Sequence, residues 1–538
     1  MRFPTTLFSA LSIALVLYSC TNQGDNKPKE NLLFSKKIKS ASKLKMCLEG
    51  ELKNQLQLND SVIQWLSDRY KKNNYKLLWF QGPDSNLTLS EKGSKIKDLV
   101  DRPLWYGIPE NRIALQAKNE KHPIIADILM TAKSSIMLHD IQNGFFKDSI
   151  YTTPKCSQQS AYDNLLAKND FKELPEYLFT CSSADSNYQF LARKIYEFCS
   201  LYPLDRTTFQ VKSIKEDSVN WKKNAAQALH LKGYLSSIDT SNILFDKALK
   251  TFQIQNGLKP DGKVGTHTAT ALNESTYDKI LRAALTLDKI RTKVQYPSKF
   301  VRINLPEYLL RYVIDDTLRS VHNVVIGKYS NQTPQLKSKI HTIVVYPYWT
   351  VPFSISSKEI LPAQKANSGY IKRHNYKLFR GDTEIDPASV NWKKIPNKTF
   401  PYKIVQEPGP KNSLGIVKFE FHNKYSVYVH DSPQKNFFKS DVRSYSHGCM
   451  RCALPDSLAR LMLNNDSTLN KRRGNHLIGD SLDSLLIVAK NYPIRLIDPV
   501  PVYVEYQSVV ATEEDLIFYL DIYHRDEKFL KSMRDINK

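Results

Sequence analysis

An imidazole and a thiol that could cooperate in one reaction lie in the C-terminal part of the chain. Cys449 follows His430 by 19 residues (449 − 430), so one short loop would bring the two side chains together. A thiol is mostly protonated at neutral pH and becomes a strong nucleophile once a neighbouring base removes its proton, so this pair is the minimum for acyl transfer. We therefore predict Cys449 as the nucleophile and His430 as the general base.

The residues around this pair fit acyl transfer. The run 425–430 alternates like a strand, which would put Tyr428 and His430 on one face. Gly448 precedes the thiol and lets the backbone approach a bound carbonyl closely. We expect the backbone N–H groups of Gly448 and Cys449, with the Tyr428 hydroxyl as a further donor, to stabilise an oxyanion.

Two residues close to the thiol keep other assignments open. His447 lies two residues before Cys449, so spacing alone allows either His447 or His430 to be the base. Cys452 lies three residues after Cys449, but we expect it to be packed and inert, because free cysteine is among the most buried residue types. The two cysteines lack a second pair or a histidine at ligand spacing, so they do not predict a zinc site.

These motifs carry a resemblance to a known family. His430-Asp431, followed by Ser446-His-Gly-Cys-Met-Arg451, resembles the signature of YkuD-type L,D-transpeptidases, cysteine enzymes that cross-link peptidoglycan stem peptides. Six further segments resemble the large, lid-bearing branch of that family: 344–352, 360–362, 369–370, 407–410, 412–415 and 430–433. The likeness covers the C-terminal half strongly and the N-terminal half faintly.

The resemblance also implies roles for other residues. In the family, the backbone carbonyl after the base histidine orients its ring, which is the position of Asp431, although an aspartate side chain could also fix the tautomer. Some large members have serine in place of His447, which favours a supporting role for this histidine. Trp349 matches a substrate-pocket position, with a core aromatic as the alternative. Arg451 and Arg443 are candidates to pair with a substrate carboxylate.

The implied activity is L,D-transpeptidation. The thiolate would attack the carbonyl of the third stem residue, expel terminal D-alanine and pass the acyl group to a neighbouring stem, giving a 3→3 cross-link. No metal or organic cofactor is expected, and cell-wall synthases are candidate partners. The alternatives are an L,D-carboxypeptidase, attachment of a protein to peptidoglycan, and a non-catalytic wall-binding lipoprotein. The last is disfavoured, because a binding module needs neither Cys449 nor His430.

The N-terminus predicts export. Arg2 precedes an apolar stretch, 7–18, that is too short to span a bilayer and is typical of a secretory signal. It ends at Leu17-Tyr-Ser-Cys20, which resembles a bacterial lipobox in which Cys20 becomes the lipidated first residue. A cleaved signal with an incidental cysteine is the alternative. We expect a membrane-anchored lipoprotein facing the periplasm, with a signal peptide at 1–20 and a polar tether at 21–44.

The net charge predicts the kind of partner, and the cysteine content predicts whether a disulfide can form. The formal charge of +23 predicts an anionic neighbour, but the chain has no zinc-finger, RNP or basic-helix pattern, so no nucleic acid is expected. In an oxidising compartment, Cys156, Cys181 and Cys199 could include one disulfide, and the pairing stays open.

Length and periodicity predict a multidomain α+β protein. At 538 residues the chain is long enough for three or four domains. We expect a helical scaffold at 45–220, because apolar residues recur there at steps of three and four. Residues 222–277 resemble a three-helix peptidoglycan-binding module, with a ligand-free spacer as the alternative. From 298 short β-branched runs predict a mainly β catalytic domain, 298–525, with a helical lid insertion at 354–410 and a C-terminal tail at 526–538.

Overall fold

The computed structural model describes residues 31–58, 60–145, 171, 173–181, 186–238, 242–291, 296–470 and 479–534. The predicted signal segment 1–20, with Cys20, lies outside these residues. Met1–Val100 with Ala114–Ser135 forms one compact unit, and Asp101–Ile113 with Ile136–Lys538 forms a second, so the predicted scaffold 45–220 is divided between them. In the ranges described, no helix combines the length and apolar character that crossing a membrane requires.

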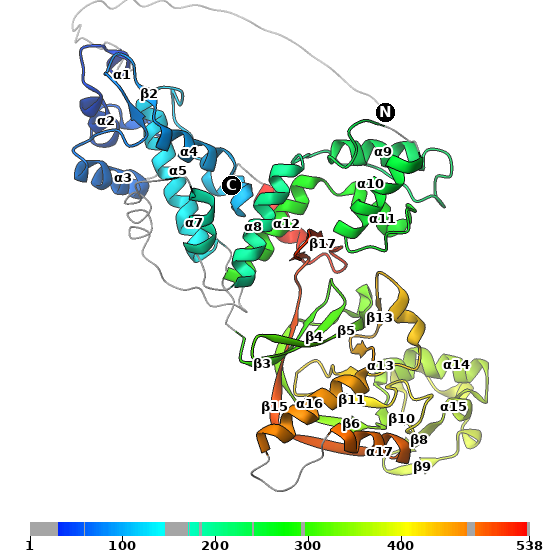
Figure 1. The fold of residues 1–538 in the computed structure, drawn as a ribbon. Coiled ribbons are helices and arrows are strands. Elements are labelled where there is room, and N and C mark those ends of the chain that lie inside the picture. Colours follow the sequence, from blue (N-terminus) through cyan, green and yellow to red (C-terminus); the bar gives the residue numbers. More distant parts are fainter. Residues whose placement is uncertain are drawn as a thin grey trace, which may run out of the picture. The chain divides into compact units, whose positions relative to one another are not determined.

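The first unit is helical apart from one short hairpin (Figure 1). Its elements are α1 (Asn31–Phe34), α2 (Ser40–Glu49), α3 (Asp60–Lys72), β1 (Phe80–Gln81), β2 (Thr88–Leu89), α4 (Glu91–Asp101) and the start of α5 (Pro123–Asn143). The tether predicted at 21–44 is wrong for residues 31–44, because Leu33 and Leu44 are fully buried in the core of this unit. Apolar side chains in that stretch stabilise α1 and α2 by burial.

A buried carboxylate fixes the hairpin of this unit on α5. Asp127 accepts hydrogen bonds from the N–H of Trp79 at 2.8 Å and from the hydroxyl of Tyr70 at 2.6 Å. Burial raises the pKa of Asp127 to about 6, while these donors oppose the rise. The segment that leads into β1 is therefore held beside α5 by hydrogen bonds as well as by packing.

The second unit is helical between the end of α5 and its β domain. They are α7 (Leu174–Cys181), α8 (Ser186–Leu201), α9 (Trp221–Leu231), α10 (Asn242–Gln255), α11 (Thr266–Asn273) and α12 (Thr276–Arg291). α9, α10 and α11 fall in the predicted 222–277 segment and share a core that contains Leu229, Leu249 and Leu272. Almost every residue of α12 is buried, including Arg282, which bonds Glu274 at 2.7 Å.

The C-terminal segment differs from the predicted tail. After the β domain the chain forms β16 (Val509–Ala511), β17 (Leu516–Phe518) and α18 (Glu527–Arg534). α18 buries Leu530 and Met533 on one face, so the tail expected at 526–538 is wrong up to residue 534. Asp526 bonds Lys289 of α12 at 3.0 Å, and both side chains are buried. The segment from β16 to α18 therefore packs against the helical part of this unit.

The β domain is one nine-stranded sheet. Its strands are β3 (Lys299–Asn304), β4 (Leu309–Ile314), β5 (Thr317–Gly327), β6 (Leu336–Val345), β11 (Val417–Phe421), β12 (Val429–His430), β13 (Ser444–Ser446), β14 (Met450–Cys452) and β15 (Tyr492–Glu505). Their order is β13-β5-β14-β12-β11-β6-β15-β3-β4, and β4 also pairs with β5, so the sheet closes on itself. The β-branched runs predicted this mainly β fold, because such residues pack well on a pleated surface.

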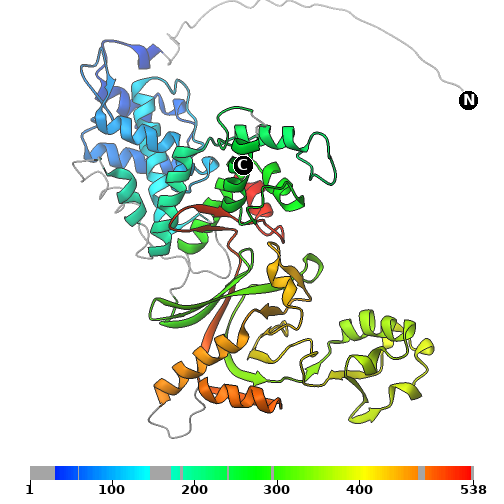
Figure 2. The ribbon, with the colours of Figure 1, turned by 45° about the vertical axis from the view of Figure 1, so that its right-hand side comes forward.

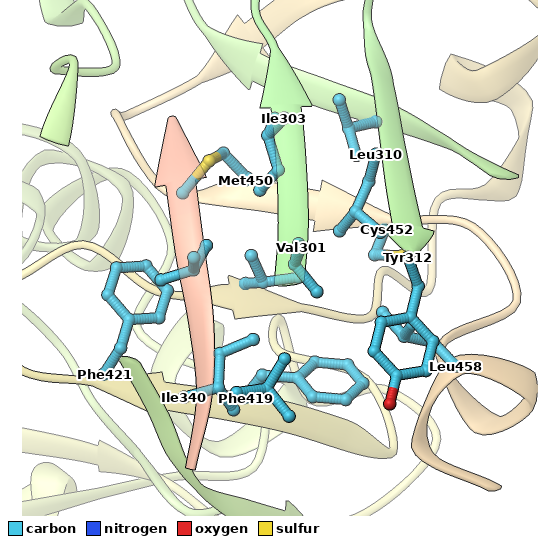
Figure 3. Close-up of a cluster of buried hydrophobic side chains, with 14 of the residues drawn as sticks. Val301, Ile303, Leu310, Tyr312, Ile340, Phe419, Phe421, Met450, Cys452 and Leu458 are labelled. Atoms are coloured by element: carbon cyan, nitrogen blue, oxygen red, sulfur yellow. The ribbon is translucent and has the colours of Figure 1, made fainter. Parts of the chain in front are cut away.

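The interior of the sheet is apolar. Figure 3 shows Val301, Ile303, Phe419, Met450 and Cys452 among the clustered side chains, all of which are fully buried. Two helices, α16 (Pro455–Asn470) and α17 (Gly479–Val488), follow β14, and the first begins at Pro455, because proline is favoured in the first turn of a helix. β12 and β14 are thus anchored by one core, which fixes the side chains on their other face.

The insertion between β6 and β11 folds around a core of its own (Figure 2). It contains β7 (Trp349–Thr350), α13 (Phe353–Ile355), a π-helical turn (Ser356–Ile360), α14 (Leu361–Ala366), α15 (Tyr370–Arg373), β8 (Tyr376–Arg380), β9 (Thr383–Ile385) and β10 (Lys403–Gln406). The helices were expected, but the four-stranded sheet β7-β10-β8-β9 was not. Its strands of two to five residues are too short to give a clear period in the sequence.

Candidate active site

The sheet brings the predicted nucleophile and base to one face. β12 and β14 are parallel neighbours, with His430 paired to Arg451. Side chains alternate along a strand, and paired residues point to the same side of a sheet. Met450 and Cys452 point into the core. Cys449 and Arg451 therefore lie on the opposite face, together with His430.

Tyr428 joins this face although it lies outside a strand. The alternating run 425–430 forms a strand only at Val429–His430, because Ser426 has a left-handed backbone with φ of +57°. The Tyr428 and His430 rings are nevertheless 5.6 Å apart, so both side chains lie where the alternation predicted. The hydroxyl and the backbone N–H of Tyr428 lie near enough to the Cys449 sulfur to favour its thiolate.

The Cys449 thiol is partly buried in these surroundings. Burial raises its pKa, and the Tyr428 donors, Lys418 and Arg451 oppose that rise. The net direction is upward, so the resting side chain is a neutral thiol at neutral pH. Activation therefore requires a base at the moment of attack rather than a thiolate formed beforehand.

His430 supplies a neutral imidazole. Its side chain is 5% exposed, and burial lowers its pKa to about 3, with Arg451 and Lys418 adding to the effect. The carbonyls of Asp431 and Leu414 favour the charged ring and partly oppose the shift. Within the described part of the chain, His430 Nδ1 is buried and has no hydrogen-bond partner. The ring can therefore accept a proton across the whole neutral range.

The Asp431 side chain is engaged away from this ring. Its Oδ2 accepts the Ile416 N–H at 3.1 Å, and its Oδ1 pairs with the ammonium of Lys435. Gly415 packs directly against it with φ of +63°, and a Cβ there would lie 2.3 Å from the carboxylate. Asp431 thus holds the turn that brings the Leu414 carbonyl to His430.

Hydrogen bonds fix the turn that carries the nucleophile. Gly448 has φ of +116°, a conformation that side chains rarely adopt. Its N–H donates to Ser446 Oγ at 3.1 Å, and its carbonyl accepts from Thr333 Oγ1 at 2.8 Å. Ser446 Oγ also donates to the Cys449 carbonyl at 2.5 Å. The Gly448 N–H is therefore occupied by Ser446, which leaves the Cys449 N–H and the Tyr428 hydroxyl as the candidate oxyanion donors.

His447 bonds to the insertion. Its Nε2 lies 2.6 Å from Oε1 of Glu359 in the π-helical turn, and both side chains remain partly exposed. Trp349 at the root of the insertion lies beside the Tyr428 hydroxyl and lowers its pKa, against the larger effect of burial. It also packs against the core of the insertion, so it has features of both predicted roles.

The two candidate arginines differ in their surroundings. Arg443 donates to the carbonyls of Val324, Ser440 and Tyr308 at 2.9 to 3.2 Å, so its guanidinium holds backbone together. Arg451 donates to Gln434 at 3.0 Å and lies near enough to Cys449 to favour its thiolate. Arg451 is thus the arginine placed beside the reacting group.

The site also contains residues that the sequence did not single out. Lys418 lies opposite His430 on β11, with its Nζ 4.4 Å from the centroid of the Tyr428 ring. The alternation of the run 416–421 could have placed it on this face. Thr333 and Glu359 lie 116 and 90 positions before Cys449 (449 − 333 and 449 − 359), and no local pattern signals such contacts.

The other cysteines whose side chains the structure describes are all buried. Cys452 is fully buried in the β-domain core, as expected, and burial raises its pKa. Cys47 and Cys199 are buried free thiols. The predicted disulfide therefore cannot use Cys199 in this structure, and the Cys156–Cys181 pairing lies outside the side chains described.

Comparison with known proteins agrees with this geometry. Residues 298–469 match the family described as YkuD, the L,D-transpeptidase catalytic domain. A Haemophilus influenzae protein named "Putative L,D-transpeptidase" is 26% identical over 346 residues, and the match covers 61% of this chain. It covers 65% of that relative, so the chain spans just under two thirds of its length.

A solved structure was also found. The crystal structure of L,D-transpeptidase (Yku) from Stackebrandtia nassauensis is 14% identical with a TM-score of 0.19, covering 53% of this chain and 90% of that one. The assignment depends on the family match over the segment that contains both His430 and Cys449. Residues 298–469 form a YkuD-type L,D-transpeptidase catalytic domain.

Proposed function

We propose that this protein is a peptidoglycan L,D-transpeptidase that forms 3→3 cross-links through an acyl-enzyme on Cys449. The observation that carries the proposal is the placement of Cys449 and His430 on one face of the paired strands β12 and β14. The Tyr428 hydroxyl lies beside the thiol on that face, where it could serve as a donor for the developing oxyanion.

In the acylation step, Cys449 Sγ attacks the carbonyl carbon of the third residue of a donor tetrapeptide stem. His430 accepts the thiol proton as the C–S bond forms, and the carbonyl electron pair moves onto the oxygen. The Cys449 N–H and the Tyr428 hydroxyl stabilise that oxyanion. Collapse of the intermediate breaks the peptide bond, and D-alanine leaves after its nitrogen takes the proton from His430.

In the second step an amine from a neighbouring stem attacks the thioester. His430 removes a proton from this nitrogen, the new amide bond forms, and the thiol of Cys449 is released with its proton. Water in place of the amine would give an L,D-carboxypeptidase. Arg451, beside the thiol, is proposed to pair with a carboxylate of the donor stem.

We propose that the insertion 354–410 acts as a lid over the donor stem. Support comes from its two contacts with the site, Glu359 with His447 and Trp349 with Tyr428. A cover that excludes water favours the amine over hydrolysis, because the thioester is otherwise open to solvent. The element that would move carries its own core and so can shift as a body.

The location of the protein is also a proposal. Lipidation at Cys20 and export would place the enzyme at the wall, and the 222–277 helices would serve as a peptidoglycan-binding module. A Cys20→Ser variant that no longer incorporates labelled palmitate, while native protein does, would support the anchor. Equal labelling of both proteins would contradict it.

Two measurements test the proposed activity. Muropeptides from cells expressing native protein should contain 3→3 dimers that are missing with Cys449→Ala, and Cys452→Ala should retain most of them. Intact-mass spectrometry should find a carbapenem adduct on native protein and on Cys452→Ala, but none on Cys449→Ala. An adduct that persists in Cys449→Ala and is lost in Cys452→Ala would show that Cys452, and not Cys449, is the nucleophile.

A further inference from the structure

A pocket of about 250 Å³ lies in the first compact unit, and nothing in the transpeptidase reaction uses it. Three segments line it: the start of α2, the loop between β1 and β2, and the start of α5. Polar groups dominate its wall, among them Ser40, Lys43, Asp84, Asn86 and His122. The pocket is a concave, preformed site in the part of the chain whose role the sequence did not predict.

Lys43 is the unusual residue in this wall. Its side chain is only 8% exposed. Among the described residues, no hydrogen bond or ion pair is found for its ammonium group. Burial lowers the pKa of Lys43. The negative charge of Asp84, which lies too far away to form an ion pair, partly opposes this effect. Lys43 is mostly buried and lines the pocket, and its ammonium has no bonded partner among the described residues, so an anionic group that pairs with it would be bound favourably.

The backbone adds positive potential to the same pocket. α2 and α5 both begin there, and neither helix has an acidic residue in its first turn. The N-terminus of a helix carries a partial positive charge and N–H groups that favour anions. The Ser40 N–H at the start of α2 is bonded to Asp84 Oδ1 at 3.1 Å.

His122 does not supply the missing partner. Its Nδ1 accepts the Ile124 N–H at 3.3 Å. Burial lowers the pKa of His122, and Lys43 lowers it further, while the Leu33 carbonyl opposes the shift. The ring is therefore neutral near pH 7 and serves the start of α5. Asp84 supplies the carboxylate of the pocket wall, and it is bonded to α2 rather than to Lys43.

We propose that this pocket binds an oxyanion group, a carboxylate or a phosphate, carried by a small polar ligand. The ammonium of Lys43 pairs with the anion. The side chains of Ser85 and Asn86, in the β1–β2 loop, hydrogen-bond the remainder of the ligand. The site belongs to the N-terminal helical unit and is separate from the residues that carry the transpeptidase chemistry.

Calorimetric titration of the full chain with three probes distinguishes the sources of the anion. The probes are inorganic phosphate, N-acetylmuramic acid, which carries a carboxylate, and N-acetylglucosamine, which lacks it. The choice of the muramic sugar rests on the proposed function, whereas phosphate does not. Binding of the muramic sugar alone assigns a carboxylate ligand, and binding of phosphate alone assigns a phosphate ligand. Binding of neither anion, or of N-acetylglucosamine equally well, overturns the proposal.

Matched variants place the binding in this pocket. Lys43→Met should weaken anion binding by about tenfold to a hundredfold, the usual value of a charge-assisted hydrogen bond. Lys118→Met, at an exposed lysine of the same unit outside the pocket wall, should leave it unchanged. Asp84→Asn should tighten it severalfold, because the carboxylate that repels the anion is gone. Unchanged binding in Lys43→Met overturns the site.

Two controls keep the test decisive. If Lys43→Met does not fold, the Asp84→Asn titration decides, and equal or weaker binding in that variant overturns the site. Covalent capture of a carbapenem at Cys449 should be the same in every folded variant. Loss of anion binding with intact capture separates this pocket from the proposed function, and failure of capture in native protein would concern the catalytic domain alone.

Discussion

A thiol whose pKa is raised and an imidazole whose pKa is lowered do not exchange a proton at rest. Burial acts on both, since it disfavours the thiolate of Cys449 and the imidazolium of His430. The resting pair is therefore neutral. The proton moves to His430 as the C–S bond forms, because sulfur gives a lone pair to the carbonyl carbon and its S–H bond becomes strongly acidic, while the S–H electron pair stays on sulfur.

The pH dependence of acylation follows from this neutral pair. The His430 pKa is lowered to about 3, so its basic form persists as the pH falls through 6.5 and is lost only as the pH approaches about 3. We expect the rate of carbapenem acylation to stay nearly constant from about pH 8 to about pH 5. Stopped-flow measurement on the native enzyme checks this. A decline centred near 6.5 would mean that His430 titrates like an ordinary histidine.

Tyr428→Phe removes one donor without removing the ring. The hydroxyl lies near enough to the Cys449 sulfur to affect its pKa and is the candidate side-chain donor to the oxyanion. Loss of such a donor typically slows the reaction by about 10²–10³-fold. Tyr425→Phe is the matched control, because Tyr425 is 48% exposed. Acylation rates by mass spectrometry that fall equally in both variants would remove Tyr428 from the oxyanion site.

At the residue scale, the sequence predicted the two reacting side chains but not the residues that position them. Cys449 and His430 stood out because a thiol and an imidazole have few other joint uses at that spacing. Thr333 and Lys418 did not, because a threonine and a lysine occur everywhere, and their roles come from contacts across the sheet. The alternation of the run 416–421 could place Lys418 on one face of its strand, but which strand lies beside it is set by the fold and leaves no local pattern.

Among the elements, the insertion is the one whose contacts can be tested directly. Glu359→Ala breaks its bond to His447 in the loop that carries the nucleophile. We expect more water to reach the thioester, so the ratio of hydrolysed tripeptide to cross-linked dimer should rise. Carbapenem capture should change by less than about threefold, because the reacting groups are intact.

The control for this prediction lies in the same insertion. Glu384→Ala removes an exposed carboxylate that pairs with Lys377 and does not contact the catalytic loop. Product analysis should give the native ratio for this variant. If Glu359→Ala also gives the native product ratio, the Glu359–His447 contact contributes no more than an ordinary surface ion pair.

Helices and strands were predictable where their pattern of apolar residues extended over many positions. Strands β3 to β6 and β11 have β-branched residues that follow the pleat over five or more positions, and the sequence predicted them. The sheet of the insertion was missed, because β7 and β9 have two and three residues. α18 was missed because only Leu530 and Met533 are buried among charged neighbours.

At the scale of the molecule, the C-terminal segment returns to the helical part of its unit. Asp526 is buried, pairs with Lys289 and accepts the Ser508 hydroxyl at 2.5 Å. Asp526→Ala leaves the buried ammonium of Lys289 without this carboxylate, which typically costs about 3–5 kcal/mol. Thermal unfolding should show a lower Tm. Glu527→Ala, at an exposed neighbour, should change it little, and equal effects would mean that the pair contributes no more than a surface contact.

The parallel pairing of β12 with β14 has a consequence for engineering. The distance between the nucleophile and the base is set by strand register and by the core beneath, not by the segment that joins them. Residues 436–439 of that segment can therefore be exchanged for other loops, provided that Lys435 keeps its pair with Asp431 and Arg443 keeps its bonds to Ser440 and Tyr308. Libraries built there would vary the entrance to the site and select for new acceptors, while the reactive pair stays in place.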